Sequence, residues 1–378
     1  MQRSLQEPII QEMSDKMVII LGPRQCGKTT LSKMLNASFD YFNYDFAKHR
    51  LELKEMSWDR DKEIIIFDEI HKMKLWKSWL KGIYDVEGNQ PNIVVTGSAK
   101  LDAFKKVGDS LAGRYFQFNL HPIDIKEAVK YEALSAEESY ERLLTVSGFP
   151  EPFLKGKKNY YNRWKKSHID VILKEDLLQI SNIRDIRSIE TLIELLKQRV
   201  GSPLSIRSLS IDLQRDPKTV KRWVEVLENL YVIFRVRPFH KNVARSLLKE
   251  AKIYFYDTAM LNDNEGVKLE NITACSLLKE CHFQQNVKGE EFELHYLRNK
   301  DGDEIDFLVT HNKNPHTAIE VKLSEQTPSK AFNKLIRFKQ PINMLQIVKN
   351  LDKIKSYPSG VKIKPALDYL QSICFNFS

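Results

Sequence analysis

Cysteine, glycine and proline are scarce in this chain, and each shortage excludes a class of protein. Four cysteines, at positions 26, 275, 281 and 374, lie far apart, which excludes a disulfide scaffold and a zinc site built on paired cysteines. Glycine and proline number 14 each, too few for a fibrous or disordered chain. No run approaches the roughly 18 to 20 uncharged apolar residues of a membrane span, and residues 1–16 lack the apolar core of a signal peptide. We therefore expect reduced thiols, no membrane partner and a cytoplasmic location.

The remaining composition is that of a globular protein with a modest excess of positive charge. Hydrophobic residues make up 42% and charged residues 29% of the chain. A length of 378 residues predicts two or three domains with buried cores. Lys and Arg total 59 against 50 Asp and Glu, a formal charge of +9. This excess is compatible with DNA as a partner but does not require it.

A phosphate-binding pattern stands near the start of the chain. Residues 17–30 read MVIILGPRQCGKTT, an apolar β-branched run followed by a glycine-rich loop and then helical spacing. Backbone amides of such a loop turn inward on phosphates, a lysine reaches the β and γ oxygens, and a Thr hydroxyl ligates Mg²⁺. A chance match in an ordinary strand, turn and helix is the alternative. The expected ATP-binding residues are Gly22, Pro23, Arg24, Gln25, Cys26, Gly27, Lys28, Thr29 and Thr30, with Thr29 as a ligand of Mg²⁺.

A second buried run, Ile64 to Phe67, ends in two acidic residues. At the carboxyl edge of a parallel sheet, Asp68 would hold Mg²⁺ and Glu69 would polarise the water that attacks the γ-phosphate. Two solvated acids at a strand end are the alternative. A strand-like segment, Tyr41 to Phe46, lies between this run and the phosphate loop, so the acidic strand does not immediately follow the loop strand.

Two further polar positions follow in the sequence. A buried strand, Ile93 to Thr96, ends in Gly97-Ser98, and Ser98 resembles a sensor of the γ-phosphate. Arg114 precedes an alternating strand, Tyr115 to Phe118. It is either an arginine finger that stabilises charge during phosphoryl transfer, in its own subunit or in a neighbour, or a surface arginine.

The segments GPRQCGKTTL, IIIFDEIHK, VVTGSAK and SLAGRYFQFNLHP together resemble those of prokaryotic AAA-type ATP-binding proteins whose C-terminal half is a nuclease-like domain of unknown function. The resemblance runs through essentially the whole chain and implies an additional strand between the loop strand and the acidic strand. Cys26 inside the phosphate loop and His121 depart from the pattern. A thiol there would make binding redox-sensitive, or Cys26 is simply a small buried residue.

The middle of the chain predicts helices and a small DNA-binding module. Helical periodicity runs from Tyr161 through Leu196 and indicates a helical connector. Two amphipathic segments around a QRDP turn, followed by the alternating YVIFRVRPF, predict a winged helix. Such a module either contacts DNA or serves only to pack domains together. The residues suited to phosphate contacts are the basic Lys218, Lys221, Arg222, Arg235 and Arg237 and the neutral Thr219.

Residues 292–322 predict a three-stranded meander that carries acidic residues. Asp306 falls in the middle strand, and the two-residue spacing puts Glu320 and Lys322 on one face of the next. Two carboxylates can bind Mg²⁺ or Mn²⁺, and an ammonium can stabilise a phosphodiester. The segments IDF and EVK resemble a PD-(D/E)xK nuclease core, in which Glu270, or more weakly Glu280, supplies the upstream carboxylate. An ordinary charged hairpin and an inactive nuclease fold are the alternatives.

The sequence thus predicts an α/β protein with a P-loop AAA-type parallel sheet, a winged helix and a restriction-endonuclease-like domain. We expect an ATPase domain over 1–130, a helical connector over 131–200, a winged-helix module over 201–245 and a nuclease-like domain over 246–378. The expected activity is Mg²⁺-dependent ATP hydrolysis coupled to DNA or to a partner protein. A nucleotide-occupied switch without turnover, an ATP-controlled nuclease with a second Mg²⁺ or Mn²⁺, and a homo-oligomer are left open.

Overall fold

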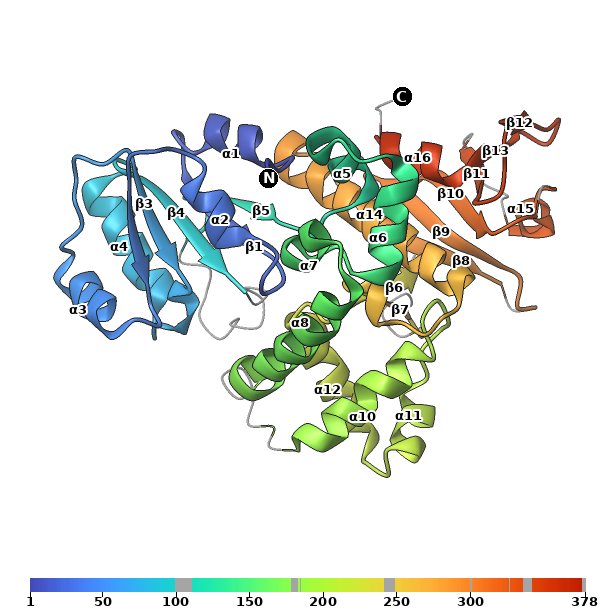
Figure 1. Ribbon diagram of the computed structural model, residues 1–378, viewed down its shortest axis with the longest axis horizontal. Coiled ribbons are helices and arrows are strands. Elements are labelled where there is room, and N and C mark those ends of the chain that lie inside the picture. The colour runs from blue at the N-terminus through green and yellow to red at the C-terminus, as the bar shows by residue number, and fades with distance from the viewer. Residues whose placement is uncertain are drawn as a thin grey trace. The chain divides into compact units, whose positions relative to one another are not determined.

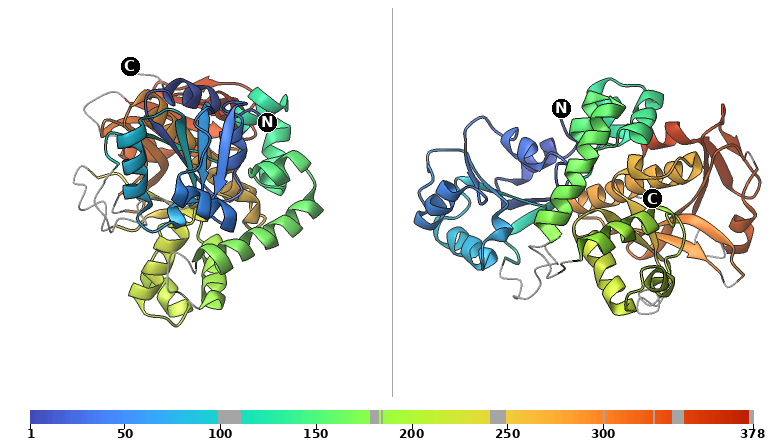
Figure 2. Two further views of the ribbon diagram at one scale, coloured as in Figure 1. Left: turned by 90° about the vertical axis from the view of Figure 1, so that its left-hand side faces the viewer. Right: turned by 60° about the horizontal axis from the view of Figure 1, so that its bottom comes forward.

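The chain folds into two compact units, Met1–Pro122 with Asn229–Tyr231 (unit 1), and Ile123–Glu228 with Val232–Ser378 (unit 2). The structure, a computed structural model, describes residues 1–98, 111–177, 183, 185–240, 249–299, 301–325, 327–335 and 342–375. Its helices and strands are shown in Figure 1 and from two further sides in Figure 2.

Unit 1 contains a five-stranded sheet in which every pairing is parallel, in the order β2-β3-β4-β1-β5. Strand β4 lies between the loop strand β1 and the acidic strand β3, and the predicted additional strand is present as β2, which follows β1 in sequence and pairs with β3. The predicted strand 41–46 begins and ends earlier, as β2. The elements of unit 1 are α1 (Gln6–Glu12), β1 (Met17–Leu21), α2 (Lys28–Lys33), β2 (Phe39–Asn43), α3 (Ala47–Glu55), β3 (Ile64–Asp68), η1 (Ile70–Lys72), α4 (Trp76–Glu87), β4 (Asn92–Gly97) and β5 (Tyr115–Asn119).

Strands β1, β3 and β4 are buried along nearly their whole length, as expected where helices cover both faces of a parallel sheet. Alternate residues of a strand point to the same face. One face of these strands, including Ile19, Phe67 and Val95, packs with Leu53 of α3 and Leu80 of α4. This packing fixes the strands side by side, so the residues at their carboxyl ends meet at one edge of the sheet.

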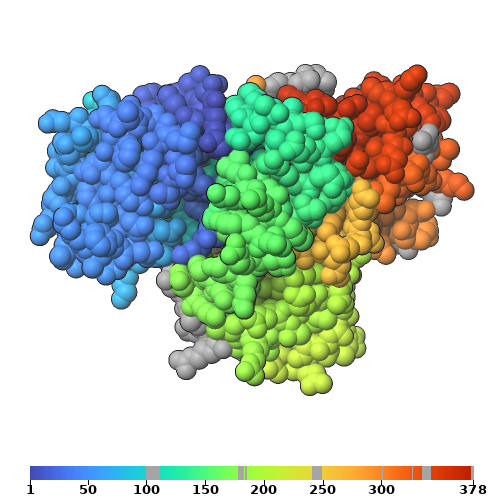
Figure 3. All heavy atoms as spheres, viewed as in Figure 1, coloured from blue at the N-terminus to red at the C-terminus, as the bar shows by residue number. Residues whose placement is uncertain are grey.

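Unit 2 begins with helices and ends with a mixed sheet. Its helices are α5 (Ile125–Glu132), α6 (Ala136–Thr145), α7 (Pro150–Lys155), α8 (Lys158–Val171), η3 (Ile172–Asp176), α10 (Ile186–Lys197), α11 (Ile206–Asp212), α12 (Pro217–Asn229), η4 (Thr258–Met260), α14 (Glu265–Lys288), α15 (Lys330–Leu335) and α16 (Ala366–Ser372). The helices coloured green to yellow-green lie on the face of unit 2 turned to the viewer in Figure 3. Part of the predicted helical run 161–196, at 178–182 and 184, lies outside the described residues.

The eight-stranded sheet of unit 2 has the order β12-β13-β11-β10-β9-β8-β6-β7. The predicted meander over 292–322 is confirmed, because β8, β9 and β10 pair antiparallel. Strand β6 pairs antiparallel with β7 and parallel with β8. The sheet thus crosses the predicted boundary between residues 245 and 246, because β6, which lies in the predicted wing segment, belongs to it together with β7. Its strands are β6 (Ile233–Pro238), β7 (Lys252–Phe255), β8 (Phe292–Arg298), β9 (Glu304–His311), β10 (Asn314–Lys322), β11 (Asn343–Val348), β12 (Lys355–Ser356) and β13 (Val361–Pro365).

Helices α11 and α12 stand where the sequence predicts two amphipathic helices around a turn. Asp216 accepts a hydrogen bond from the backbone N–H of Lys218 (2.8 Å) at the start of α12, as expected of a capping residue. The assignment of this segment as a winged helix, and of the C-terminal part as a nuclease-like domain, stays a prediction. Among the helices that the structure describes, none has the length and apolar character needed to cross a membrane.

Candidate functional site

The phosphate loop leaves β1 at its carboxyl end and enters α2 at Lys28. Gly27 has a φ of 97°, a left-handed conformation that glycine adopts without strain. Lys28 is buried, and its ammonium donates to the carbonyl oxygens of Gly22 (3.0 Å) and Pro23 (2.7 Å). The ammonium therefore lies inside the loop, bound to carbonyls that phosphate oxygens of a nucleotide would replace.

The remaining loop residues differ in exposure. Arg24 is half-buried and Gln25 exposed, and on α2 Thr29 is half-buried and Thr30 exposed. Gln25 has a φ of 62°, so the backbone turns sharply here. The loop is consequently open to solvent on one side and buried at its base.

Three buried contacts hold the base of the loop. A Cβ on Gly22 would lie 2.1 Å from the carbonyl oxygen of Leu120, so only glycine fits there. The guanidinium of Arg3 donates to the carbonyl of Cys26 (2.9 Å) and to that of His121 (2.6 Å). The sequence predicts no role for His121, and the structure shows that its backbone oxygen accepts one of the hydrogen bonds from Arg3. These contacts join the loop to the chain that follows β5.

The thiol of Cys26 belongs to this buried base. Its Sγ donates to the carbonyl of Leu120 (3.5 Å), and burial raises its pKa above the ordinary value. A thiol held protonated is a poor nucleophile and reacts slowly with oxidants. Its surroundings favour the interpretation of Cys26 as a small buried residue over a redox-sensitive one.

The carboxylate of Asp68 gathers three hydroxyl groups at the edge of the sheet. Thr29 donates to Oδ2 (2.8 Å), Tyr41 donates to the same oxygen (2.7 Å), and Thr96 donates to Oδ1. Asp68 is 4% exposed, so these bonds replace the water that an exposed carboxylate would have. Burial, followed by the bond to Asp68, raises the pKa of Tyr41, and its hydroxyl stays a neutral donor. The sequence-predicted Mg²⁺ ligands Thr29 and Asp68 are thereby brought together.

Mg²⁺ prefers oxygen ligands and keeps several of its waters, so one hydroxyl and one carboxylate beside the phosphates of a nucleotide suffice. Thr29 and Asp68 provide this pair at the start of a helix that follows the phosphate loop. The residues present therefore fit a magnesium ion held jointly by protein and nucleotide.

Glu69 lies next to Asp68 but in a different group of side chains. Its Oε2 accepts from the hydroxyl of Ser98 (3.2 Å) and lies 3.5 Å from Nε2 of His71 and 3.7 Å from Nζ of Lys72. Burial lowers the pKa of His71, so its imidazole is neutral at neutral pH. The structure therefore brings the expected base Glu69 into contact with the expected sensor Ser98.

Arg114 does not join this group. It precedes β5, and its carbonyl accepts from the N–H of Met17, the first residue of β1. Arg114 therefore lies at the amino edge of a parallel sheet, at the other end of the strands from the phosphate loop. Its guanidinium pairs with Asp85 (2.7 Å). This position does not allow Arg114 to contact a nucleotide bound to its own loop, because the length of β1 lies between them. A role on the nucleotide of a second copy stays a prediction.

In unit 2 the structure brings the predicted acidic residues together around two lysines. Asp306 accepts from the N–H of Val321 (2.9 Å), and Glu320 accepts from the N–H of Asp306 (3.4 Å). The ammonium of Lys322 lies 2.8 Å from Glu320, as the two-residue spacing predicts. Burial, followed by the charge of Asp306, raises the pKa of Glu320.

Glu270 lies on the other side of Asp306, and a lysine from β7 comes between the two. The ammonium of Lys252 is 3.3 Å from Glu270 and 3.5 Å from Asp306. The weaker candidate Glu280 lies elsewhere and pairs with Lys126 (2.9 Å). Within the described ranges, no group of three or more His, Cys, Asp or Glu side chains is arranged to hold a metal ion. The second Mg²⁺ or Mn²⁺ stays a prediction.

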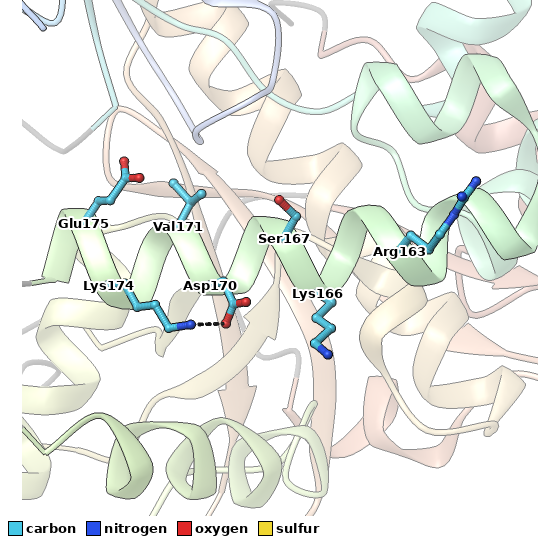
Figure 4. A pocket seen from close by; sticks show the side chains of 7 residues that line it. All are labelled: Arg163, Lys166, Ser167, Asp170, Val171, Lys174 and Glu175. Carbon is cyan, nitrogen blue, oxygen red and sulfur yellow. Dashed lines mark ion pairs between the residues drawn. The ribbon is translucent and has the colours of Figure 1, made fainter.

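A cavity of about 460 Å³ lies along α8 and η3. Figure 4 shows that its lining side chains all come from this one helical stretch, with Lys174 paired to Asp170 (3.3 Å). Among the residues that the structure describes, the lining of this cavity thus comes from one helical stretch, whereas ligand sites usually combine polar groups from several elements.

Three family models match successive parts of the chain. An AAA domain matches residues 14–129, a domain of unknown function (DUF8612) matches 137–271, and a second domain of unknown function (DUF4143) matches 265–368. The AAA match covers the phosphate loop, Asp68, Glu69 and the strand order described above, and it supports an AAA-type ATPase. The descriptions of the two C-terminal families name no activity.

The relatives that match the chain bear the description 'uncharacterized protein'. A protein of Methanocaldococcus jannaschii is 24% identical over 366 residues, which cover 87% of this chain and 80% of the relative. One of Mycobacterium tuberculosis is 23% identical over 254 residues, 66% of this chain and 56% of the relative. Among solved structures, a Signal Transduction ATPase with Numerous Domains with a tetratricopeptide repeat sensor, from Pyrococcus horikoshii, is 14% identical and has a TM-score of 0.26. That match covers 74% of this chain and 46% of the other, and a score so low supports no conclusion about fold or function.

Four residues of these sites were not found by sequence reasoning. Tyr41 and Thr96 bind Asp68, Arg3 holds the phosphate loop, and Lys252 enters the acidic cluster. Tyr41 and Thr96 lie in predicted strands, whereas the sequence analysis makes no prediction for the segments around Arg3 and Lys252.

Proposed function

We propose that the chain binds ATP with Mg²⁺ and hydrolyses it at the carboxyl edge of the unit 1 sheet. The observation that carries the proposal is the contact between Thr29 and Asp68 beside the buried ammonium of Lys28. The AAA match over residues 14–129 supports it. A hydroxyl, a carboxylate and an ammonium next to inward-facing loop amides are the groups that bind a nucleoside triphosphate and its metal.

Each residue has a defined task in this reaction. Lys28 exchanges its bonds to the loop carbonyls for bonds to the β and γ oxygens of ATP. Mg²⁺, when bound, neutralises charge on these phosphates. Glu69 accepts a hydrogen bond from the attacking water and orients it, and Ser98 holds the carboxylate of Glu69 in place. Tyr41 and Thr96 keep Asp68 oriented when the hydroxyl of Thr29 turns to the metal.

Phosphate release from ATP, measured with and without Mg²⁺, tests the proposal. We expect wild type to release phosphate only with Mg²⁺, Lys28→Ala to lose ATP binding, and Glu69→Gln to bind ATP without releasing phosphate. Lys48→Ala, which changes an exposed lysine on α3, is the matched control and should behave as wild type. Full turnover in Lys28→Ala would refute the proposal.

A second candidate is a nucleotide-occupied switch that turns over little or no ATP. It is favoured by one observation: Oε2 of Glu69 already accepts from Ser98 and lies near His71 and Lys72, so an attacking water would compete with these groups for it. The two candidates differ in a single experiment. A hydrolase releases phosphate many times per chain, whereas a switch retains one ATP per chain after gel filtration and releases no phosphate.

We propose DNA as the partner of the helix α12. Lys218, Lys221 and Arg222 are exposed on this helix, while Arg235 on β6 is paired with Glu228 (2.6 Å). Exposed basic residues on the second helix of such a pair are suited to phosphate contacts in a groove. Fluorescence anisotropy with duplex DNA should show binding that weakens with salt and is lost when the three residues are changed to Ala. Equal binding by this triple variant would refute the contact.

A further inference from the structure

The acidic cluster of unit 2 connects four elements, a helix and three strands. Glu270 comes from α14, Glu304 and Asp306 from β9, and Glu320 from β10. Lys252 enters from β7, a strand that pairs with β6. Its ammonium contacts Glu304 (2.6 Å), Glu270 (3.3 Å) and Asp306 (3.5 Å).

Lys252 is an unusual lysine because its side chain is only 1% exposed. Buried ammonium groups are rare and occur where carboxylates surround them. Here three carboxylates from two elements converge on one nitrogen, as ligands converge on a cation. The ammonium of Lys322 pairs with Glu320 and brings a second positive charge to the same cluster.

The surroundings of Lys252 leave it little freedom to move aside. The ring of Tyr296 lies 5.6 Å from its ammonium, in a cation–π geometry. Tyr254 donates its hydroxyl to Oε1 of Glu270 (2.7 Å), the same oxygen that Lys252 contacts. A Cβ on Gly201 would lie 2.9 Å from both carboxylate oxygens of Glu270, so the backbone closes the cluster on that side.

We infer that the ammonium of Lys252 is the resident cation of this cluster, where it lies between Glu270 and Asp306, two of the three carboxylates that the sequence predicts as ligands of a nuclease metal. The cluster is then a charge network that fastens β7 to α14 and β9. Unit 2 binds no divalent cation there, and the Mg²⁺ requirement of the protein belongs to the nucleotide alone. A DNA strand brought to this site would meet no metal-bound water, so it is not cleaved.

Mn²⁺ is a suitable probe, because the electron paramagnetic resonance signal of free Mn²⁺ falls as the ion binds. The titration uses the full chain without nucleotide at neutral pH. We expect wild type and Asp306→Asn to take up equal amounts, and wild type to leave supercoiled plasmid intact with Mn²⁺. We expect Lys252→Met to gain one Mn²⁺ per chain, and the double variant Lys252→Met/Asp306→Asn to lose that gain.

Lys268→Met is the matched control. Lys268 is also a buried lysine of this unit, but its described carboxylate partner, Asp263 (3.1 Å), is fully exposed. This variant should gain no Mn²⁺ site. Two results would overturn the inference: greater Mn²⁺ uptake by wild type than by Asp306→Asn, or a folded Lys252→Met that takes up no additional Mn²⁺. If Lys252→Met does not fold, the comparison of wild type with Asp306→Asn decides alone.

Discussion

The hydroxyl of Tyr41 provides a sharp test of the magnesium site, because one oxygen atom can be removed without disturbing the fold. Tyr41→Phe deletes the donor to Oδ2 of Asp68 (2.7 Å) and keeps the ring, which lies under the ammonium of Lys33 (3.7 Å). Asp68 loses one of the hydrogen bonds that orient it. We therefore expect weaker Mg²⁺ binding with little change in ATP binding in the absence of metal.

The size of the effect follows from the charge of the acceptor. A hydrogen bond to a charged group contributes about 1.5 to 3 kcal/mol. Tyr41 is half-buried, so water replaces part of the lost bond and the lower figure applies. About 1.5 kcal/mol corresponds to roughly a tenfold change in an equilibrium constant. Loss of a residue that orients a metal ligand lowers metal affinity by about 10- to 100-fold, which agrees with this figure.

The assay is the initial rate of phosphate release at saturating ATP over a range of Mg²⁺ concentrations. We expect the half-saturating Mg²⁺ concentration to rise about tenfold in Tyr41→Phe. Tyr44→Phe changes a neighbouring tyrosine that packs against the core of unit 1 and should leave the Mg²⁺ dependence as in wild type. Calorimetry can measure the Mg²⁺ dependence of ATP binding for the same variants in a Glu69→Gln background, and this measurement does not need ATP turnover. An unchanged Mg²⁺ dependence of Tyr41→Phe in both assays would refute the role of its hydroxyl.

Three further predictions concern the loop, the distant arginine and a buried acid. Gly22→Ala should abolish ATP binding, measured by calorimetry, because the added Cβ would lie 2.1 Å from the carbonyl oxygen of Leu120; normal binding would contradict this contact. If Arg114 acts on the nucleotide of a second copy, Arg114→Ala should lose phosphate release and should regain part of it when it is mixed with Lys28→Ala protein. If no activity returns, the role on a second copy is refuted, and the ion pair within its own chain is the role that remains for Arg114. Burial raises the pKa of Asp257, so the unfolded chain releases this proton first and stability falls as pH rises above about 3.9, the ordinary value. Urea unfolding at several pH values should show a smaller fall in Asp257→Asn, and an equal fall in both proteins would contradict the assignment.

Much of the proposed nucleotide site could be predicted because its residues occupy fixed places in short motifs. Lys28 and Thr29 follow a glycine-rich loop, and Asp68 ends an apolar strand. Parallel strands present their carboxyl ends at one edge, so the motifs alone indicated that these residues meet. Tyr41 escaped because it stands within a strand, where a tyrosine is as common for packing as for function.

The acidic cluster shows where such reasoning stops. The spacing of Glu320 and Lys322 predicted their contact, because alternate residues of a strand share a face. Nothing in the sequence near Lys252 indicates that it reaches Asp306 and Glu304, which follow some 50 residues later. The pairing of β6 with β7 and with β8 brings them together. That pairing also joins two predicted domains into one sheet.

The sequence by itself determined the elements, the order of motifs and the chemistry of the phosphate loop, because these depend on neighbours within about ten positions. Only the tertiary structure decided which distant groups neutralise one another. It placed Arg114 at the far edge of the sheet and Lys252 among the carboxylates. Electrostatic energy depends on the distance between charges in space. Strand pairing sets that distance, and it cannot be predicted from the spacing of neighbouring residues in the sequence.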